Sequence, residues 1–237
     1  QRYWVEGHDG NDGGYARVGF SKDGWNHFTT SAGYVLRGAS DEAGVKRYAN
    51  NDGNVYDGWI VTSAFTGGLE RFYQKGGSLL RSTFFNDGGW WAYASDSSAV
   101  LRGVKMVSNG VVLADNDGKI AGGDTGGWLV SGAYGQGLQR YYLEKTDEGY
   151  CLAKPGYSAQ GWSHYTTDGG YVLRGILKVG DKVYLADNDG CLARNGKSES
   201  GWLVTSAYGQ GLQRYWVEGH DGNDGGYARV GFSKDGW

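Results

Sequence analysis

The chain has 237 residues, and 45 of them are glycine against a single proline, which is unlike an ordinary globular composition. Aromatic residues make up 15% and charged residues only 21%, so the chain can bury enough apolar surface to fold and is not a flexible linker. A net charge of −3 and the lack of any long apolar run argue against a nucleic-acid binder and a membrane span.

The first part of the chain, residues 1–68, is predicted to form short β-strands one after another, because turn signals recur about every ten residues. Segments rich in Tyr, Val, Leu and Trp lie between these signals, and no stretch has a helical pattern. The turn signals of this module fall at 10–14, 22–24, 31–33, 40–44, 50–53 and 66–68. We therefore expect a series of β-hairpins.

The remainder of the chain repeats this first part. Residues 213–237 are identical to residues 1–25, and the Val-Leu-Arg-Gly motif ending at Gly38 recurs at Gly103 and Gly175. Self-similarity of this kind is the sequence signature of a repeat architecture. We predict three modules and a partial fourth, at 1–68, 69–137, 138–211 and 212–237.

The third module illustrates the expected hairpin. Apolar residues alternate in 183–186 and 191–193, on either side of the Asp-Asn-Asp-Gly sequence at 187–190, which we interpret as a type I′ turn. A lone hairpin is marginally stable in water, so each must bury its aromatic face on the next one. The predicted fold is all-β, an elongated solenoid of stacked β-hairpin repeats.

The order of motifs in each repeat is an aromatic strand, an acidic-glycine turn, a short second strand and a closing glycine-aromatic pair. Two examples are Arg140-Tyr141-Tyr142-Leu143 with 146–149 and Gly156-Tyr157, and Tyr184-Leu185 with 187–190 and Gly201-Trp202. This order resembles the cell-wall-binding and glucan-binding repeats of Gram-positive surface proteins, which include the choline-binding repeats. The resemblance implies a superhelix of hairpins that holds ligands between consecutive hairpins in aromatic cages. Here arginine replaces the first aromatic of the signature.

The aromatic residues of these motifs are the candidate ligand contacts, since indole and phenol faces hold a sugar or a quaternary ammonium. The alternative is that the same rings form the core of a narrow solenoid, and some can do both. We also expect Trp59, Trp128 and Trp202 to be equivalent and mostly buried. The candidates for carbohydrate binding are Trp25, Trp59, Trp90, Trp128, Trp162, Trp202, Tyr141, Tyr142, Tyr215 and Trp216.

Neither catalysis nor a metal is predicted. His27 and His164 are equivalent, but the middle module has Ala92 at their position, and no constellation of unlike catalytic residues occurs. The Asp-Asn-Asp-Gly sequences that begin at Asp115 and Asp187 lack the full pattern of a calcium loop, and turn formation explains them. We therefore expect no enzyme activity, no cofactor and no metal.

The repeated arginines have two interpretations. They stack on aromatic rings between hairpins, or they form a ladder of charge for phosphate-bearing wall polymers. Cys151 and Cys191 both lie in the third module, and a disulfide between them is an open alternative.

The predicted function is a non-catalytic array of a secreted bacterial surface protein, located outside the cell. It binds cell-wall polysaccharide or another glycan and acts as a spacer, with a signal peptide expected upstream. The rival prediction is a purely structural fibre whose aromatics serve only packing. The identity of residues 1–25 with 213–237 further predicts head-to-tail self-association.

Overall fold

The structure is a computed structural model that describes residues 1–7, 13–21 and 26–231. The chain divides into two compact units, residues 1–101 and 102–237. The described residues contain strands and turns but no helix, and every strand pair is antiparallel, which confirms the all-β prediction. No described segment therefore forms a helix that is long and apolar enough to cross a membrane.

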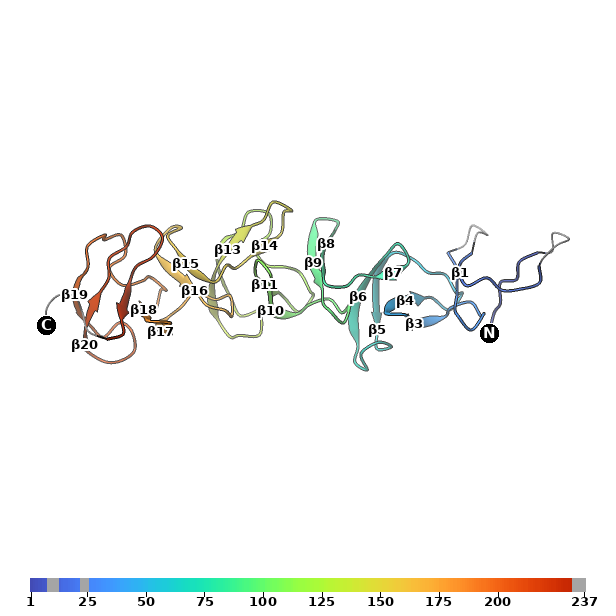
Figure 1. Ribbon diagram of the computed structural model, residues 1–237, viewed down its shortest axis with the longest axis horizontal. Helices are drawn as coiled ribbons and strands as arrows, with labels where there is room; N and C mark the ends of the chain where they lie inside the picture. Colours follow the sequence, from blue (N-terminus) through green and yellow to red (C-terminus); the bar gives the residue numbers. More distant parts are fainter. Residues whose placement is uncertain (8–12, 22–25, 232–237) are drawn as a thin grey trace. The chain divides into compact units, whose positions relative to one another are not determined.

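The first unit holds four small sheets, β1-β2, β3-β4, β5-β6-β7 and β8-β9. Within the unit the hairpins follow one another in chain order (Figure 1). Their strands are β1 (Gly19–Phe20), β2 (Phe28–Thr29), β3 (Gly38–Glu42), β4 (Val45–Ala49), β5 (Gly58–Thr62), β6 (Glu70–Lys75), β7 (Ser78–Leu79), β8 (Thr83–Asp87) and β9 (Trp90–Ala94).

The second unit holds five sheets, β10-β11, β12-β13-β14, β15-β16, β17-β18-β21 and β19-β20. One strand departs from chain order: β21 pairs with β18, although the β19-β20 hairpin lies between them in the sequence. The strands are β10 (Gly103–Val107), β11 (Gly110–Ala114), β12 (Gly127–Ser131), β13 (Gln139–Lys145), β14 (Cys151–Leu152), β15 (Gly156–Ser158), β16 (His164–Thr166), β17 (Gly175–Val179), β18 (Lys182–Ala186), β19 (Gly201–Thr205), β20 (Gln213–Val217) and β21 (Tyr227–Arg229).

Two kinds of hairpin recur along the described part of the chain. In the first kind, two residues join the strands, as between β3 and β4, where Ala43 and Gly44 both have positive φ, the requirement of a type I′ turn. In the second kind, a seven-residue loop joins the strands, as between Thr62 and Glu70. The loops of β12-β13 and β19-β20 have the same length. The boundaries predicted for the modules fall inside these three loops.

The acidic-glycine turns are not the type I′ turns that the sequence predicted. Neither Asn116 nor Asp117 has a positive φ, whereas Gly118 has φ +89° and donates its N–H to the carbonyl of Asp115 at 3.0 Å. Asp at the first position and glycine at the fourth are typical of a type I turn. The Asp115 carboxylate also accepts the N–H groups of Asp117 and Lys119, both at 2.9 Å, so the acidic side chain closes its own turn.

These turns follow a hairpin instead of forming one. The predicted strand 183–186 lies in β18, but its five-residue partner is β17, and only a single bridge joins Ala186 to Leu192 after the turn. The same bridge follows six of the hairpins, for example from Ala114 to Ile120. Each repeat is therefore a hairpin, a tight turn and a short return segment.

The core is a series of small clusters, as expected when each hairpin can bury only one face. In the first unit, Ile60, Phe72 and Leu79 form one such cluster between β5, β6 and β7. In the second, Tyr141 and Leu143 of β13 pack with neighbouring strands. Each buried aliphatic or aromatic side chain contributes about 1.5–3 kcal/mol to stability, so the repeats are held by many local contacts.

Candidate ligand-binding site

The tryptophans Trp59, Trp128 and Trp202 lie at equivalent places, as predicted. Each is the second residue of the first strand in a long hairpin, directly opposite an aromatic residue of the second strand. The opposing residues are Tyr73, Tyr142 and Trp216, respectively. Each of these long hairpins therefore carries one cross-strand aromatic pair, and the residues that cover the pair come from the next hairpin.

In the second unit, the next hairpin covers Trp128 with another tryptophan. The rings of Trp128 and Trp162 are stacked, with centroids 4.0 Å apart and an interplanar angle of 14°. His164 lies edge-on to Trp128 at 4.7 Å and to Tyr142 at 5.0 Å. The guanidinium of Arg140 lies 5.8 Å from the centroid of Trp162 and pairs with Asp189 at 3.2 Å.

In the first unit, Trp59 forms a comparable cluster. Its ring lies 5.4 Å from both Trp90 and Tyr73 and 5.5 Å from Phe85. Its indole N–H donates to the carboxylate of Asp87 at 2.7 Å. Trp59 and Trp90 are both half-buried, like Trp128 and Trp162, so burial of these rings is less complete than predicted.

A cross-strand exchange explains why the two clusters look different in sequence. Phe85 faces Ala92 across β8-β9, and Ser158 faces His164 across β15-β16. The ring of Phe85 packs on Trp59 and Tyr73, as the ring of His164 packs on Trp128 and Tyr142. One large side chain therefore fills the space in each cluster. It comes from the first strand of the hairpin in one cluster and from the second strand in the other. The replacement of histidine by Ala92 reflects packing.

Burial sets the electrostatics of His164. The residue is fully buried, its Nδ1 lies 2.9 Å from the carbonyl oxygen of Trp162, and its Nε2 has no hydrogen-bond partner. Desolvation lowers the pKa of His164 below its ordinary value of 6.5, against the opposing effects of that carbonyl and of Glu144. The imidazole is therefore neutral and acts as an aromatic packing group.

Two predicted ligand contacts point into the core. Tyr141 is fully buried, and its hydroxyl donates to the side-chain oxygen of Gln136 at 3.2 Å. Burial raises the pKa of Tyr141. Tyr215 is the equivalent residue of β20 and packs on Tyr208, with centroids 5.7 Å apart. We therefore set aside Tyr141 as a ligand contact, because no ligand reaches a fully buried ring.

Trp202 is the most open of the described tryptophans on the long hairpins. Its side chain is 42% exposed, Trp216 packs edge-on at 5.3 Å, and the guanidinium of Arg214 lies 4.4 Å from its ring centroid. This stacked arginine matches the packing interpretation of the repeated arginines. The predicted candidate Trp25 lies outside the described residues.

A pocket of about 370 Å³ lies beside Trp128. Trp128 and Tyr134 supply aromatic walls, and Asp115 and Lys119 supply charged groups, so the lining is amphipathic. The remaining lining residues are Ile120, Ala121, Gly122, Gly123, Gly126, Gly127 and Leu129. We call this the Trp128 pocket.

The loop that forms this pocket requires glycine at two positions. A Cβ at Gly122 would lie 2.6 Å from the Cβ of Cys151, and one at Gly126 would lie 2.4 Å from the carbonyl oxygen of Leu143. Both glycines also have positive φ, +98° and +70°. Sequence reasoning missed this pocket. The sequence did carry a signal for it: the segment between the acidic-glycine turn and Trp128 is longer than the segment between the equivalent turn and Trp59.

A second pocket, of about 480 Å³, lies in the first unit and also escaped the sequence analysis. All of its lining residues carry polar side chains, and Arg2 donates to the backbone carbonyl of Asp52 at 3.3 Å. The lining residues are Arg2, His27, Asn50, Asp52 and Asn54. Such groups can donate to and accept from several hydroxyls of one ligand.

The described residues contain no group of three or more acidic, histidine or cysteine side chains placed to hold a metal ion. Cys151 is buried and Cys191 is half-buried, and both are free thiols, so the disulfide left open by the sequence is not formed. Burial raises the pKa of both thiols.

No protein-family model matches the chain, and neither does any curated protein sequence. Among solved structures, choline-binding protein F of Streptococcus pneumoniae matches with a TM-score of 0.50 at 20% identity, over 90% of this chain and 71% of that one. A structure of that protein with a peptidoglycan analogue gives 0.48 at 24% identity, over 81% and 61%. CbpJ of the same organism gives 0.48 at 17% identity, over 80% and 62%, so this chain spans about three fifths of the last two. The motif resemblance is thus confirmed in three dimensions: this chain has the hairpin-repeat fold of choline-binding protein F.

Proposed function

We propose that the chain is a non-catalytic array of a secreted bacterial surface protein that binds cell-wall or glycan polymer. The observation that carries this proposal is the Trp128 pocket. Its volume of about 370 Å³ lies within the range of roughly 300–1,000 Å³ that is usual for ligand sites. An indole wall, a phenol ring and two charged side chains match the apolar face and the hydroxyls of a sugar.

The stacking of Trp128 on Trp162 determines how a ligand can bind. At 4.0 Å the two rings are in van der Waals contact, so no ligand enters between them. The ligand instead lies in the pocket against Trp128, which the stack holds in a fixed orientation. A rigid aromatic wall reduces the entropy lost on binding. Trp202 is a second, more exposed contact of the same kind.

The fold supports the class of partner. Choline-binding protein F, which shares the fold, has been crystallised with a tetrasaccharide-pentapeptide analogue of peptidoglycan. We propose that this chain uses the fold in the same setting, outside the cell. In this proposal the repeats at 1–68, 69–137 and 138–211, with the partial repeat at 212–237, continue as an elongated solenoid that serves as a spacer.

The test uses a matched pair of variants. Trp128→Phe keeps a ring for stacking but shortens the wall of the pocket, and Trp59→Phe makes the same change at the equivalent position, where the preceding segment is shorter. We expect Trp128→Phe to weaken binding to purified cell walls or their polysaccharide about tenfold, which is about 1.4 kcal/mol, and Trp59→Phe to leave it unchanged.

The result that would contradict the proposal is equal binding by the parent chain and both variants, or no binding by any of them. Unfolding midpoints of the two variants serve as the control. Trp59→Phe also removes the hydrogen bond to Asp87, so a loss of binding confined to Trp128→Phe does not follow from a greater loss of stability. Absence of binding by a fully folded parent chain would favour the rival function, a structural fibre in which the tryptophans only pack. The stacked pair Trp128–Trp162 is the observation that keeps this rival open.

A further inference from the structure

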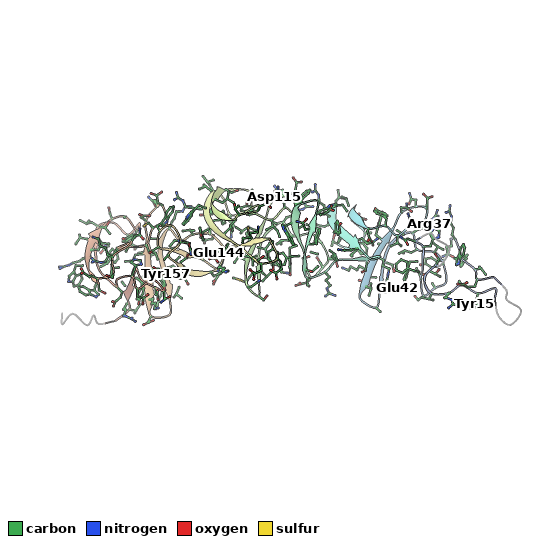
Figure 2. The ribbon with its side chains drawn as sticks, turned by 90° about the horizontal axis from the view of Figure 1, so that it is seen from above. Tyr15, Arg37, Glu42, Asp115, Glu144 and Tyr157 are labelled. Carbon is green, nitrogen blue, oxygen red and sulfur yellow. The ribbon has the colours of Figure 1, made fainter. Side chains whose placement is uncertain are left out.

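The third repeat carries residues equivalent to those that line the Trp128 pocket. The two repeats align at the acidic-glycine turns that begin at Asp115 and Asp187, and again at Trp128 and Trp202. Asp115, labelled in Figure 2, marks one side of the pocket in the second repeat. We call the equivalent set the third-repeat site; its residues are Asp187, Cys191, Leu192, Ala193, Arg194, Gly201, Trp202, Leu203 and Tyr208.

The fixed parts of the two sites have the same geometry. Tyr134 is buried and packs edge-on against Tyr141 with ring centroids 5.3 Å apart, and Tyr208 packs in the same way against Tyr215 at 5.7 Å. The aspartate that begins each turn accepts two backbone N–H groups, all at 2.9 Å. The third repeat therefore supplies the same tryptophan, tyrosine and aspartate as the open pocket.

Two lining positions differ between the repeats. Gly122 and Lys119 of the second repeat correspond to Arg194 and Cys191 of the third, and the loop that follows is two residues longer in the third repeat. The backbone has positive φ at the first position in both, +98° at Gly122 and +56° at Arg194. This conformation is uncommon for a residue other than glycine. The third repeat thus keeps the local backbone conformation and adds a long side chain to it.

The Arg194 side chain occupies space that is open in the second repeat. A Cβ at Gly201 would lie 2.9 Å from Nη1 and 3.2 Å from Cζ of Arg194. At the equivalent Gly127, no described atom other than those of its chain neighbours lies within 4 Å of such a Cβ. The Nε of Arg194 donates to the carbonyl of Glu199 at 2.9 Å, which holds the guanidinium in this place.

We propose that Arg194 closes the third-repeat site, so that a saccharide enters the pocket of the second repeat and not its equivalent in the third. Arg194 is then the residue that sets how many of these sites are open. The saccharide as ligand rests on the proposed function, whereas the closure by Arg194 does not. The contact proposed above for Trp202 is made by its exposed ring and does not use the space beside Gly201.

The loop around Arg194 is held by groups other than its side chain. The side-chain oxygen of Asn195 accepts the N–H of Ser163 at 2.9 Å, and the N–H of Lys197 donates to the backbone carbonyl of Arg194 at 2.9 Å. Arg194→Gly keeps both bonds and suits the positive φ. This variant should therefore open the site in a folded protein. Arg194→Lys, which keeps a long cationic side chain, is the matched control.

The first measurement needs no saccharide. Cys191 is half-buried at the position of the pocket residue Lys119, whereas Cys151 is fully buried. Alkylation by iodoacetamide, followed by peptide mass spectrometry, reports access to each thiol. We expect Arg194→Gly to raise the rate at Cys191 about tenfold and to leave Cys151 unreacted, because thiol reactivity follows exposure. Arg194→Lys should react at the rate of the parent chain.

The second measurement uses soluble tetrasaccharide fragments of purified cell walls in isothermal titration calorimetry. We expect Arg194→Gly to bind one more tetrasaccharide per chain than the parent, because the opened site has the same aromatic walls as the Trp128 pocket. Alkylation of Cys191 in this variant should remove the additional binding event. Arg194→Lys should bind the same number as the parent.

The closure is overturned if a folded Arg194→Gly protein alkylates at Cys191 no faster than the parent, or if Arg194→Lys reacts as fast as Arg194→Gly. A parent chain that binds the tetrasaccharide, with no additional event in Arg194→Gly, overturns the saccharide as its ligand. No binding by the parent contradicts the proposed function, and the alkylation rates still decide the closure. If Arg194→Gly does not fold, Arg194→Asn takes its place, since asparagine tolerates this φ with a short side chain.

Discussion

Exchanging the side chains that face each other across β8-β9 tests whether the aromatic clusters are packed cores. Phe85 is 8% exposed and contacts Trp59 and Tyr73, and Ala92 opposite it is fully buried. In β15-β16 the large residue, His164, comes from the other strand. The double variant Phe85→Ser/Ala92→His therefore gives the two facing positions of β8-β9 the residues that β15-β16 has.

The structure sets the magnitudes. Phe85→Ser alone removes a buried ring and should destabilise the first unit by about 3–5 kcal/mol. Ala92→His alone forces a ring into space that Phe85 fills, and should cost about 1–3 kcal/mol. If both rings compete for the same space, the double variant should lose at least about 2 kcal/mol less than the sum of the single changes.

Urea unfolding followed by tryptophan fluorescence measures these differences, because Trp59 and Trp90 report on the cluster. Hydrogen exchange of the β8-β9 amides assigns the effect to this unit. Additivity of the two single changes within about 0.5 kcal/mol would refute the reasoning, since independent sites add. The histidine and alanine at this position would then differ for a reason other than packing.

Three further predictions concern the turns, the buried histidine and metal. Ser98 has φ +74° in a turn where the six equivalent positions are glycine. Ser98→Gly should therefore raise the unfolding free energy by about 0.5–1 kcal/mol, and Gly33→Ser should lower it by a similar amount. A denaturant titration of each variant measures the change. Burial lowers the pKa of His164, so the unfolded state takes up its proton first, and the unfolding free energy should fall as the pH drops below about 6.5. In acid titrations, His164→Gln should reduce this loss of unfolding free energy. A variant with the same pH profile as the parent chain would contradict the prediction. Asp115 uses its carboxylate within its own turn, so a chelator should shift the melting temperature by no more than about two degrees in calorimetry.

The sequence by itself determined the local structure of this protein. Glycine at the turns, alternating apolar residues and the repeated motifs were sufficient to predict an all-β chain of hairpins and the equivalence of Trp59, Trp128 and Trp202. These features depend on residues close together in the chain. The predicted turn type was wrong, because the pattern Asp-Asn-Asp-Gly fits two turns that are mirror images in the backbone angles of the central residues.

The tertiary structure alone decided which aromatic faces remain open. Sequence position placed Tyr141 and Tyr142 side by side as candidates, but strand pairing turns Tyr141 into the core and Tyr142 toward Trp128. The pocket beside Trp128 depends on a loop pressed against β13 and β14, which no local pattern encodes. Val217 gives the physical reason most directly. It is fully buried because β20 pairs with β19 and packs on Leu185 and Ala193, and no pattern within residues 213–217 encodes these contacts.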